Sequence, residues 1–241
     1  MKKRSLIYGL FFFAFAAHAL FSVYSRPFQA RWMNVPPVPS EGGMVAMALG
    51  DRQMAYRMMG IMIQNLGDTG GRTAPLYEYD FNRLGEWFML EDKLDRRSNF
   101  IPFLAAYYFG GSQEAGDLDS VIDYLAVAGQ HPYTQKWRWL AQAVYLARFR
   151  QQDLDKALSL AYILADLNYE KMPGWARQMP AFIASAQGDK ETALAIMVGI
   201  LQNESATMQQ AEINFMVDYI CTRILNQFEA AQNPLCTELP L

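Results

Sequence analysis

A short pattern occurs three times in this chain at a constant spacing. The stretches GDLDSVI, QDLDKAL and GDKETAL begin at residues 116, 152 and 188, so each copy starts 36 residues after the one before it. Each copy has an aspartate at its second position, namely Asp117, Asp153 and Asp189. Aspartate is a good N-cap or first-turn residue of a helix. A repeat of this length predicts stacked helix hairpins.

Helical periodicity surrounds each copy. Apolar residues follow the aspartates at helical spacing, as with Leu154, Ala157, Leu158 and Ala161 in the second copy. Another helix is predicted before each copy, over 99–111, 136–150 and 174–187. Pro102 is tolerated in the first turn of its helix, whereas Pro180 predicts that the third of these helices is kinked or begins there. The predicted unit is therefore helix, tight turn, helix.

Weaker units extend the pattern in both directions. Residues 42–67 predict a short helix, a turn at Gly50-Asp51 and a longer helix through Leu66, and residues 79–99 predict another helix. Residues 208–228 predict one long amphipathic helix that caps the end of the stack. Its apolar stripe consists of Ile213, Met216, Val217, Ile220, Ile224 and Phe228. Nothing reads convincingly as a strand, so the fold class is predicted to be all-α, an α-solenoid of stacked helix hairpins.

These units resemble tetratricopeptide (TPR) repeats, or the related Sel1-type repeats, over roughly residues 42–203. Ala157 and Ala193 occupy the position of the alanine early in the second helix of a TPR unit, and Val121 replaces it in the first copy. The chain departs from the pattern where Phe109 and Tyr145 stand in place of a small residue, and where Tyr169 and Ser205 stand in place of a proline.

The resemblance implies a binding scaffold with a concave groove for a peptide, a helix or a partner subunit. The groove residues that it implies lie on the first helices: Tyr108, Trp139, Gln142 and Phe149. An alternative interpretation places Trp139 and Phe149 in the core between helices, because apolar stripes at helical spacing are usually buried.

The N-terminus is a basic residue cluster followed by an apolar run. Lys2, Lys3 and Arg4 precede 19 residues from Leu6 to Tyr24, which as a helix would span about 28 Å. One interpretation is an uncleaved signal anchor through residues 6–24. The other is a secretory signal cleaved near Ala17-His18-Ala19. The length of the run favours the anchor.

The charges that flank this run predict its orientation. Lys2, Lys3 and Arg4 outweigh Arg26 and Arg31, so the N-terminus is expected in the cytoplasm and residues 30–241 across the membrane. Tyr8, Tyr24 and Trp32 are expected at the two interfaces. Pro36, Pro37 and Pro39 predict an extended spacer. The predicted organisation is an anchor at 1–25, a Pro-rich linker at 26–41, helical repeats at 42–206, and a capping helix and tail at 207–241.

Few features of the chain suggest chemistry. The net charge is −3 and no basic cluster follows the first four residues, so nucleic acid is not expected as a partner. There are two histidines and no metal-ligand motif or phosphate-binding loop, so no cofactor, metal or small-molecule substrate is expected. Asp68-Thr69-Gly70 matches the aspartic protease triplet but lacks a second copy. It is interpreted as part of a glycine-rich turn that ends the helix at Leu66.

The remaining acidic residues and the two cysteines have structural interpretations. Glu91, Asp92, Asp95, Asp117 and Asp119 are interpreted as solvated faces and caps. Cys221 and Cys236 are the only cysteines, and outside the cytoplasm they can pair. The sequence leaves open whether they do.

Taken together, these features predict a non-enzymatic, membrane-anchored scaffold in a bacterial inner membrane. Its helical domain is expected on the periplasmic side, with release into the periplasm after signal cleavage as the alternative. The expected partners are proteins of the cell envelope. One alternative function is that of a permanent accessory subunit of a large membrane complex. Another is a helical domain related to murein-processing enzymes, without a catalytic site of its own.

Overall fold

The computed structural model describes residues 2–25, 35–69, 72–133, 135–167, 169 and 172–237, and in residues 2–6, 25, 69 and 72 it describes the backbone alone. Several predictions fall outside the described residues. They concern the spacer at 26–34, the flanking Arg26, Arg31 and Trp32, the side chains of Lys2, Lys3 and Arg4, and Gly70 of the glycine-rich turn.

The N-terminal segment is one helix, α1 (Lys2–Ser25). Its 24 residues extend about 36 Å at 1.5 Å per residue. The window Ile7–Tyr24 is long and apolar enough to cross a membrane, and its side chains are not buried against the rest of the chain. A signal sequence near an N-terminus has the same properties, so either interpretation of this segment fits the helix.

The chain enters the helical region at Val35, which is fully buried. The Arg83 guanidinium donates a hydrogen bond to the Val35 carbonyl at 3.0 Å, and the Trp87 indole donates to the Pro36 carbonyl at 2.8 Å. The described part of the predicted linker is therefore fixed against α4 (Phe81–Leu94). Ser40 then caps α2 (Glu41–Met47) by accepting a hydrogen bond from the Gly43 N–H.

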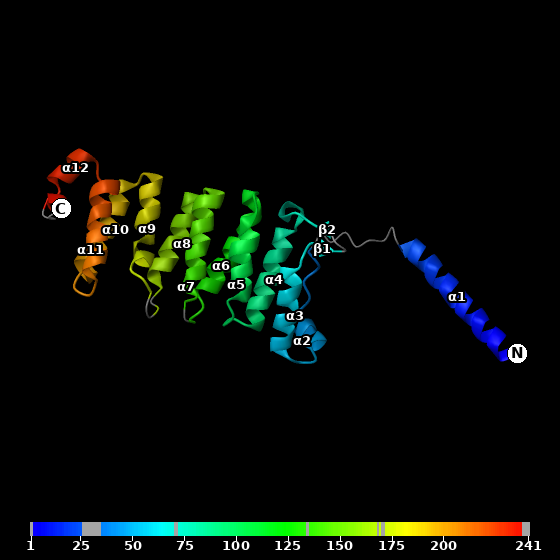
Figure 1. Cartoon of the computed structure of the whole chain (residues 1–241). Helices are drawn as coiled ribbons and strands as arrows, with labels where there is room; N and C mark the ends of the chain where they lie inside the picture. Colours follow the sequence, from blue (N-terminus) through cyan, green and yellow to red (C-terminus); the bar gives the residue numbers. More distant parts are fainter. Residues whose placement is uncertain are drawn as a thin grey trace.

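The helices from α2 onward lie side by side in the order of the sequence, as Figure 1 shows. Two of the first helices are interrupted. α5 (Phe100–Phe103) continues as a π-helical segment, Leu104–Tyr108, and a 3₁₀ turn, Phe109–Gly111, and α7 (Trp137–Tyr145) continues as a π-helical segment, Leu146–Gln151. The other helices of the row are α3 (Arg52–Gln64), α6 (Leu118–Gly129), α8 (Leu154–Asp166), α9 (Trp175–Gln187), α10 (Lys190–Glu204) and α11 (Gln210–Tyr219).

The second helices of the three sequence copies begin at a constant step. They start at Leu118, Leu154 and Lys190, which are 36 residues apart. The turns before the second and third of these helices have the same backbone conformation and the same type of cap. Gln152 and Gly188 adopt left-handed conformations with φ of 59° and 83°, and the next residue, Asp153 or Asp189, then caps the helix by accepting a backbone N–H. The predicted caps at Asp153 and Asp189 are confirmed.

The first copy has a different turn: Asp117 directly precedes α6 (Leu118–Gly129), as predicted, but makes no capping hydrogen bond. Its backbone angles are helical, and its carboxylate accepts a hydrogen bond from the Ser112 hydroxyl at 2.8 Å instead. The physical reason is the length of the connection. The first helix ends at Gly111, so residues 112–117 cross to α6 through a 3₁₀ turn, Ala115–Asp117.

The single long helix predicted over 208–228 is wrong. α11 continues through a π-helical segment, Ile220–Ile224, and stops because Leu225 is extended. Asn226 then begins α12 (Gln227–Gln232) with a capping box that includes Glu229, and a last short helix, α13 (Pro234–Thr237), follows. Phe228 is 73% exposed and takes no part in the apolar stripe.

Two further predictions need adjustment. α9 runs through Pro180 from Trp175, so the helix does not begin at the proline. α3 ends at Gln64 rather than Leu66, and a small antiparallel pair follows, β1 (Asp68–Thr69) with β2 (Arg72–Thr73). Gly67 precedes this pair with φ of +79°, and the Tyr79 hydroxyl donates to the Leu66 carbonyl at 2.5 Å.

The core runs along the row of helices. Buried side chains form one cluster from Val35 to Ile183 and a second from Ala181 to Ile224, and both include residues of α9. Val121, Ala157 and Ala193, which occupy equivalent positions early in the second helices, are all fully buried. A small residue there lets the neighbouring helix approach closely, and burial of these positions fixes how each hairpin closes.

Candidate functional site

An aromatic residue that is at least partly open to solvent lies near the middle of three successive first helices, meaning the helices 100–111, 137–151 and 175–187 that precede the turns, although not at the same position of the 36-residue repeat. Tyr107, Tyr145 and Phe182 each follow directly after two buried residues. Tyr107 and Tyr145 are exposed and Phe182 is half-buried. The buried pairs are Ala105-Ala106, Ala143-Val144 and Pro180-Ala181. Core packing therefore fixes the direction of each aromatic side chain away from the buried side of its helix.

Ring contacts extend these three residues into a longer aromatic series. The Tyr107 ring lies 5.1 Å from Phe103 and 6.3 Å from Trp139 of the next first helix. The Phe182 ring lies 4.9 Å from Tyr219 and 6.2 Å from Phe215, both on α11. We use the name aromatic series for Phe103, Tyr107, Trp139, Tyr145, Phe149, Phe182, Phe215 and Tyr219. Its rings form three groups, of which the first joins two successive first helices through Tyr107 and Trp139, and all remain partly open to solvent.

Two of the residues implied by the resemblance belong to this series. Trp139 is half-buried, contacts Tyr107, and donates its indole N–H to the Asn99 side chain at 2.8 Å. Phe149 is 53% exposed, lies 5.0 Å from the Tyr145 ring, and has the Arg148 guanidinium 4.7 Å from its centre. Phe149 is therefore not a core residue, whereas Trp139 combines packing with a partly open ring.

The other two implied residues have different surroundings. The Tyr108 ring contacts Phe109, and its hydroxyl lies near that of Tyr79, where burial first and Tyr108 second raise the pKa of Tyr79 to about 12. Gln142 is half-buried on α7. The structure thus brings Trp139 together with Tyr107, which the sequence analysis did not select, rather than with Tyr108. The signal for Tyr107 was its i+4 spacing from Phe103.

The local helix geometry also distinguishes this series. Tyr107 lies in the π-helical segment Leu104–Tyr108 and Phe149 in Leu146–Gln151. A π-helical turn holds more residues than an α-helical turn, so it changes the direction of the side chains that follow. Such segments occur frequently at functional sites. In this chain two of them present exposed aromatic rings.

A second cluster of polar groups is buried between α3, α4 and α6. Glu91 has 0% exposure, and neither of its carboxylate oxygens has a hydrogen-bond partner. Burial raises the pKa of Glu91 to about 8, so it is mostly neutral at pH 7. The buried hydroxyls of Tyr56 and Tyr124 likewise lack a hydrogen-bond partner. Burial raises the pKa of both hydroxyls; for Tyr124 the Asp92 charge is the next cause, and Glu91 contributes at both.

Charged residues next to Glu91 are paired. The Asp92 carboxylate lies 2.7 Å from the imidazole Nε2 of His131 and 3.9 Å from Arg96. Lys136 is buried and donates to the Ser98 carbonyl at 2.6 Å, and burial lowers its pKa. These contacts connect two loops to α4. The interpretation of Glu91 and Asp92 as solvated residues is wrong, because burial of a charge depends on tertiary packing that local sequence does not encode.

This buried cluster has no open approach for a substrate, because Glu91 is completely covered. Within the part of the chain that the structure describes, no group of three or more His, Cys, Asp or Glu side chains is placed to hold a metal ion. The aromatic series is therefore the better candidate for a functional surface. Its chemistry is suited to binding, since aromatic side chains dominate the energetics of many protein interfaces.

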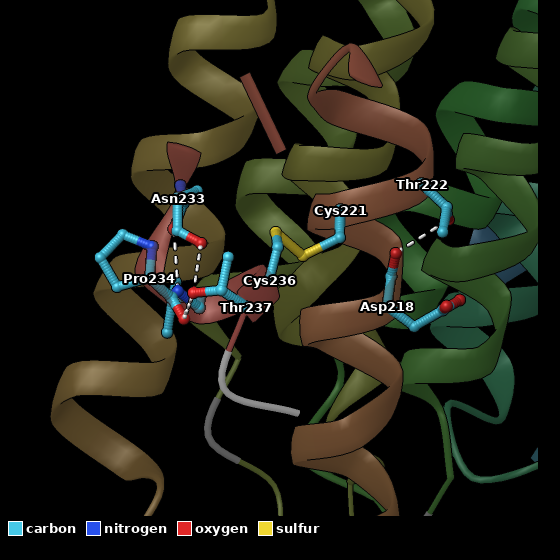
Figure 2. Close-up of a disulfide and its surroundings, with 8 residues drawn as sticks. Asp218, Cys221, Thr222, Asn233, Pro234, Cys236 and Thr237 are labelled. Carbon is cyan, nitrogen blue, oxygen red and sulfur yellow. Dashed lines mark hydrogen bonds between the residues drawn. A yellow bond between two sulfur atoms is a disulfide. The ribbon is translucent and has the colours of Figure 1, made fainter. Parts of the chain in front are cut away.

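The C-terminal helices are joined by a disulfide between Cys221 and Cys236, shown in Figure 2. The two Cα atoms lie 5.7 Å apart and the bond closes a loop with a sequence separation of 15. Cys221 comes from the π-helical segment after α11 and Cys236 from α13. Asn233 begins the short helix by accepting the Leu235 N–H, which orients Cys236 toward α11.

Comparison of the chain with protein-family models, with curated proteins and with solved structures finds no match. We therefore base the functional inference on the residues and geometry of this chain. The features that carry it are the aromatic series, the N-terminal apolar helix and the disulfide.

Proposed function

We propose that this chain is a membrane-anchored helical scaffold of TPR-like architecture that binds a protein partner of the cell envelope through its aromatic series. The observation that carries the proposal is the presence of partly open, mutually contacting aromatic rings on three successive first helices. Rings on successive first helices give an extended partner several contacts along the row. This is how helical-repeat scaffolds hold extended segments or helices.

The repeated turns support the solenoid architecture. Second helices begin every 36 residues, and the turns before α8 and α10 share a left-handed residue followed by an aspartate cap. Identical turns give successive hairpins a similar rotation, and a constant rotation generates a curved stack. In such a stack the first helices line one surface, and that is where the aromatic series lies.

The disulfide and α1 support the location. Disulfides form and persist outside the cytoplasm, so the bond between Cys221 and Cys236 favours a domain that has crossed the membrane. α1 is long enough to remain as the anchor. The scaffold accordingly faces the periplasm of a bacterial inner membrane, with the N-terminus in the cytoplasm. Cleavage of α1 would instead release the same domain.

The test is affinity purification of the full chain from membranes of its own host in mild detergent. Wild type is compared with a double substitution, Tyr145→Ala with Phe149→Ala, which removes two exposed rings of the series. The matched control is Tyr162→Ala, because Tyr162 is an exposed aromatic residue on the second helix α8. Thermal unfolding of each variant checks that the fold is retained.

The expected result is that the double substitution reduces a co-purifying protein at least tenfold, while Tyr162→Ala leaves its amount unchanged. A loss of tenfold corresponds to about 1.4 kcal/mol, which two exposed interface rings readily supply. Equal recovery with all three chains contradicts the proposed surface. Size-exclusion chromatography of the same sample distinguishes a permanent subunit, which elutes in a stoichiometric complex, from a transient scaffold, which elutes mainly as a monomer.

A further inference from the structure

The end of the row where the chain enters the domain carries an exposed apolar surface. We call it the α2–α3 end face, and it consists of Met47, Leu49, Met54, Met58 and Ile61. All five side chains are exposed. Met54, Met58 and Ile61 follow one another at i, i+4 and i+7, so they share one side of α3. The opposite side of α3, with Tyr56 and Ile63, packs into the core.

Leu49 is the most exposed member of this face. It is 91% exposed and has a left-handed backbone conformation, with φ of 55°. A leucine in this region is strained by about 1–2 kcal/mol relative to glycine. The tight turn between α2 and α3 therefore holds an apolar side chain in water in an unfavourable conformation. Strained residues of this kind cluster at functional positions such as ligand clamps and switch regions.

The length of the chain before the domain indicates what covers this face. α1 ends at Ser25, and Val35 is fixed against α4, so nine residues, 26–34, separate them. Ten residue steps of at most 3.6 Å keep Val35 within about 36 Å of the end of α1. α2 begins at Glu41, and α2 and α3 form the end of the row at which the chain enters (Figure 1). With α1 in a bilayer, this end is held near the membrane surface at a high effective concentration.

The charges beside this face fit an anionic surface. Arg57 lies on α3 next to Met58 and has no charged partner among the described residues. The acidic groups nearby are engaged: Glu41 pairs with Arg52 at 2.6 Å, and the Asp51 carboxylate accepts the N–H groups of Gln53 and Met54. Arg57 is therefore the charged group on this face that is free to contact a lipid phosphate. An exposed apolar stripe beside arginine is the pattern of helices that lie in a membrane interface.

We propose that the α2–α3 end face rests on the anionic bilayer surface that holds α1, with Leu49 and Met58 at the depth of the lipid headgroups. This inference rests on the membrane anchoring in the proposed function. The contact fixes the orientation of the row of helices relative to the membrane. It leaves the aromatic series, which begins beyond α4, free for a protein partner.

The test uses the full chain with its disulfide intact, reconstituted in vesicles of phosphatidylcholine with or without phosphatidylglycerol. Single substitutions, Leu49→Cys and Met58→Cys, carry a polarity-sensitive fluorophore, and the bonded native cysteines do not react with it. Tyr162→Cys on α8 is the control position, because Tyr162 is exposed on a helix in the middle of the row. Lipids with a nitroxide at the headgroup serve as the quencher.

The expected result is a blue shift and strong quenching of the label on Leu49→Cys and on Met58→Cys in vesicles with phosphatidylglycerol, and neither at Tyr162→Cys. Adding Arg57→Gln, or raising the salt concentration, should reduce the quenching, since salt screens charges at a surface. A blue shift without quenching by lipid, together with energy transfer between labelled copies, would mean a second copy covers the face, and would overturn the inference.

The controls separate this inference from the proposed function. Flotation of the vesicles after carbonate extraction reports whether α1 anchors the chain. If the chain is anchored but neither label is quenched, the membrane-surface contact is wrong and the proposed scaffold function is unaffected. If the chain does not stay with the vesicles, both the anchor and the contact are overturned.

Discussion

The side-chain amide of Gln187 donates a hydrogen bond to the Asp155 carboxylate at 2.7 Å. The pair Gln151 and Asp119, each 36 residues earlier, makes the same bond at 2.9 Å. In both cases the last residue of a first helix bonds to the first turn of the second helix in the preceding unit. Lys156 also donates to Asp119 at 2.7 Å and lowers the pKa of that carboxyl. Successive units are thus joined by an equivalent polar contact.

The equivalent turns predict opposite effects of glycine substitutions. Gln152 has a left-handed conformation that suits glycine, so Gln152→Gly should raise the free energy of unfolding by roughly 0.5–1 kcal/mol. Gly188 has the same conformation, and Gly188→Ala should lower the free energy of unfolding by about 1 kcal/mol. Urea unfolding followed by circular dichroism measures both. If the two substitutions shift stability in the same direction, the two turns are not equivalent.

Gly129 predicts a severe effect from a single methyl group. A Cβ at Gly129 would lie 2.4 Å from the Leu140 backbone nitrogen, because α6 and α7 cross closely at this point. Gly129→Ala should therefore destabilise the protein by about 3 kcal/mol or more, through displacement of one helix. Gly199→Ala is the matched control. It lies inside α10 with open space around it and should stabilise the protein by up to about 1 kcal/mol.

Glu91 predicts a pH dependence of stability. Its pKa rises from 4.5 to about 8 on folding, because burial disfavours the charged form. Below pH 4.5 Glu91 is protonated in both the folded and the unfolded state, so its ionisation does not lower the free energy of unfolding. As the pH rises toward 8, the unfolded state loses the proton first, so the free energy of unfolding falls by up to about 1.4 kcal/mol per pH unit.

Substitution of Glu91 isolates this effect. Glu91→Gln cannot ionise, so the decline in stability between pH 5 and pH 8 should become shallower, and the variant should be more stable than wild type above pH 8. Glu86→Gln on the exposed side of the same helix is the control and should keep the wild-type profile. Thermal unfolding across this pH range provides the comparison. An unchanged slope in Glu91→Gln would assign the pH dependence to other groups.

The disulfide predicts both a chemical and an energetic result. Protein isolated from its host without reductant should bind no thiol reagent, and after reduction and unfolding it should bind two equivalents at Cys221 and Cys236. Cys236→Ser should lower stability by about 3 kcal/mol, the chain-entropy value for a loop of this length. Mass spectrometry and urea unfolding provide the two measurements. Two reactive thiols in the native protein would contradict the bond.

The sequence predicted local features of the fold well where one residue determines them. The aspartate caps at Asp153 and Asp189 and the buried Ala157 follow from helix capping and helical periodicity. The break after Ile224 was missed because the apolar period continues through it, while the capping box of Asn226 and Glu229 starts a new helix. Two local rules competed there, and periodicity alone could not decide between them.

The candidate site was less predictable. Tyr107 was missed because its exposure depends on which side of its helix packs against the core. The π-helical segment changes the direction in which side chains leave the helix, so α-helical periodicity does not identify that side. Glu91 and Asp92 were interpreted as surface residues because charged residues usually are, and their burial between α3, α4 and α6 is a property of tertiary packing. Trp139 was a groove candidate with burial in the core as the alternative; the structure leaves it half-buried against Tyr107, which was not selected.

Site-specific photo-crosslinking in intact cells tests the central claim most directly. A photoreactive amino acid replaces Tyr107, Tyr145 or Tyr162, one at a time, in the full chain. Binding through the aromatic series predicts that a crosslink to the same protein forms at positions 107 and 145 and is absent at position 162 on α8. Crosslinks at position 162 alone, or none at 107 and 145, would contradict it.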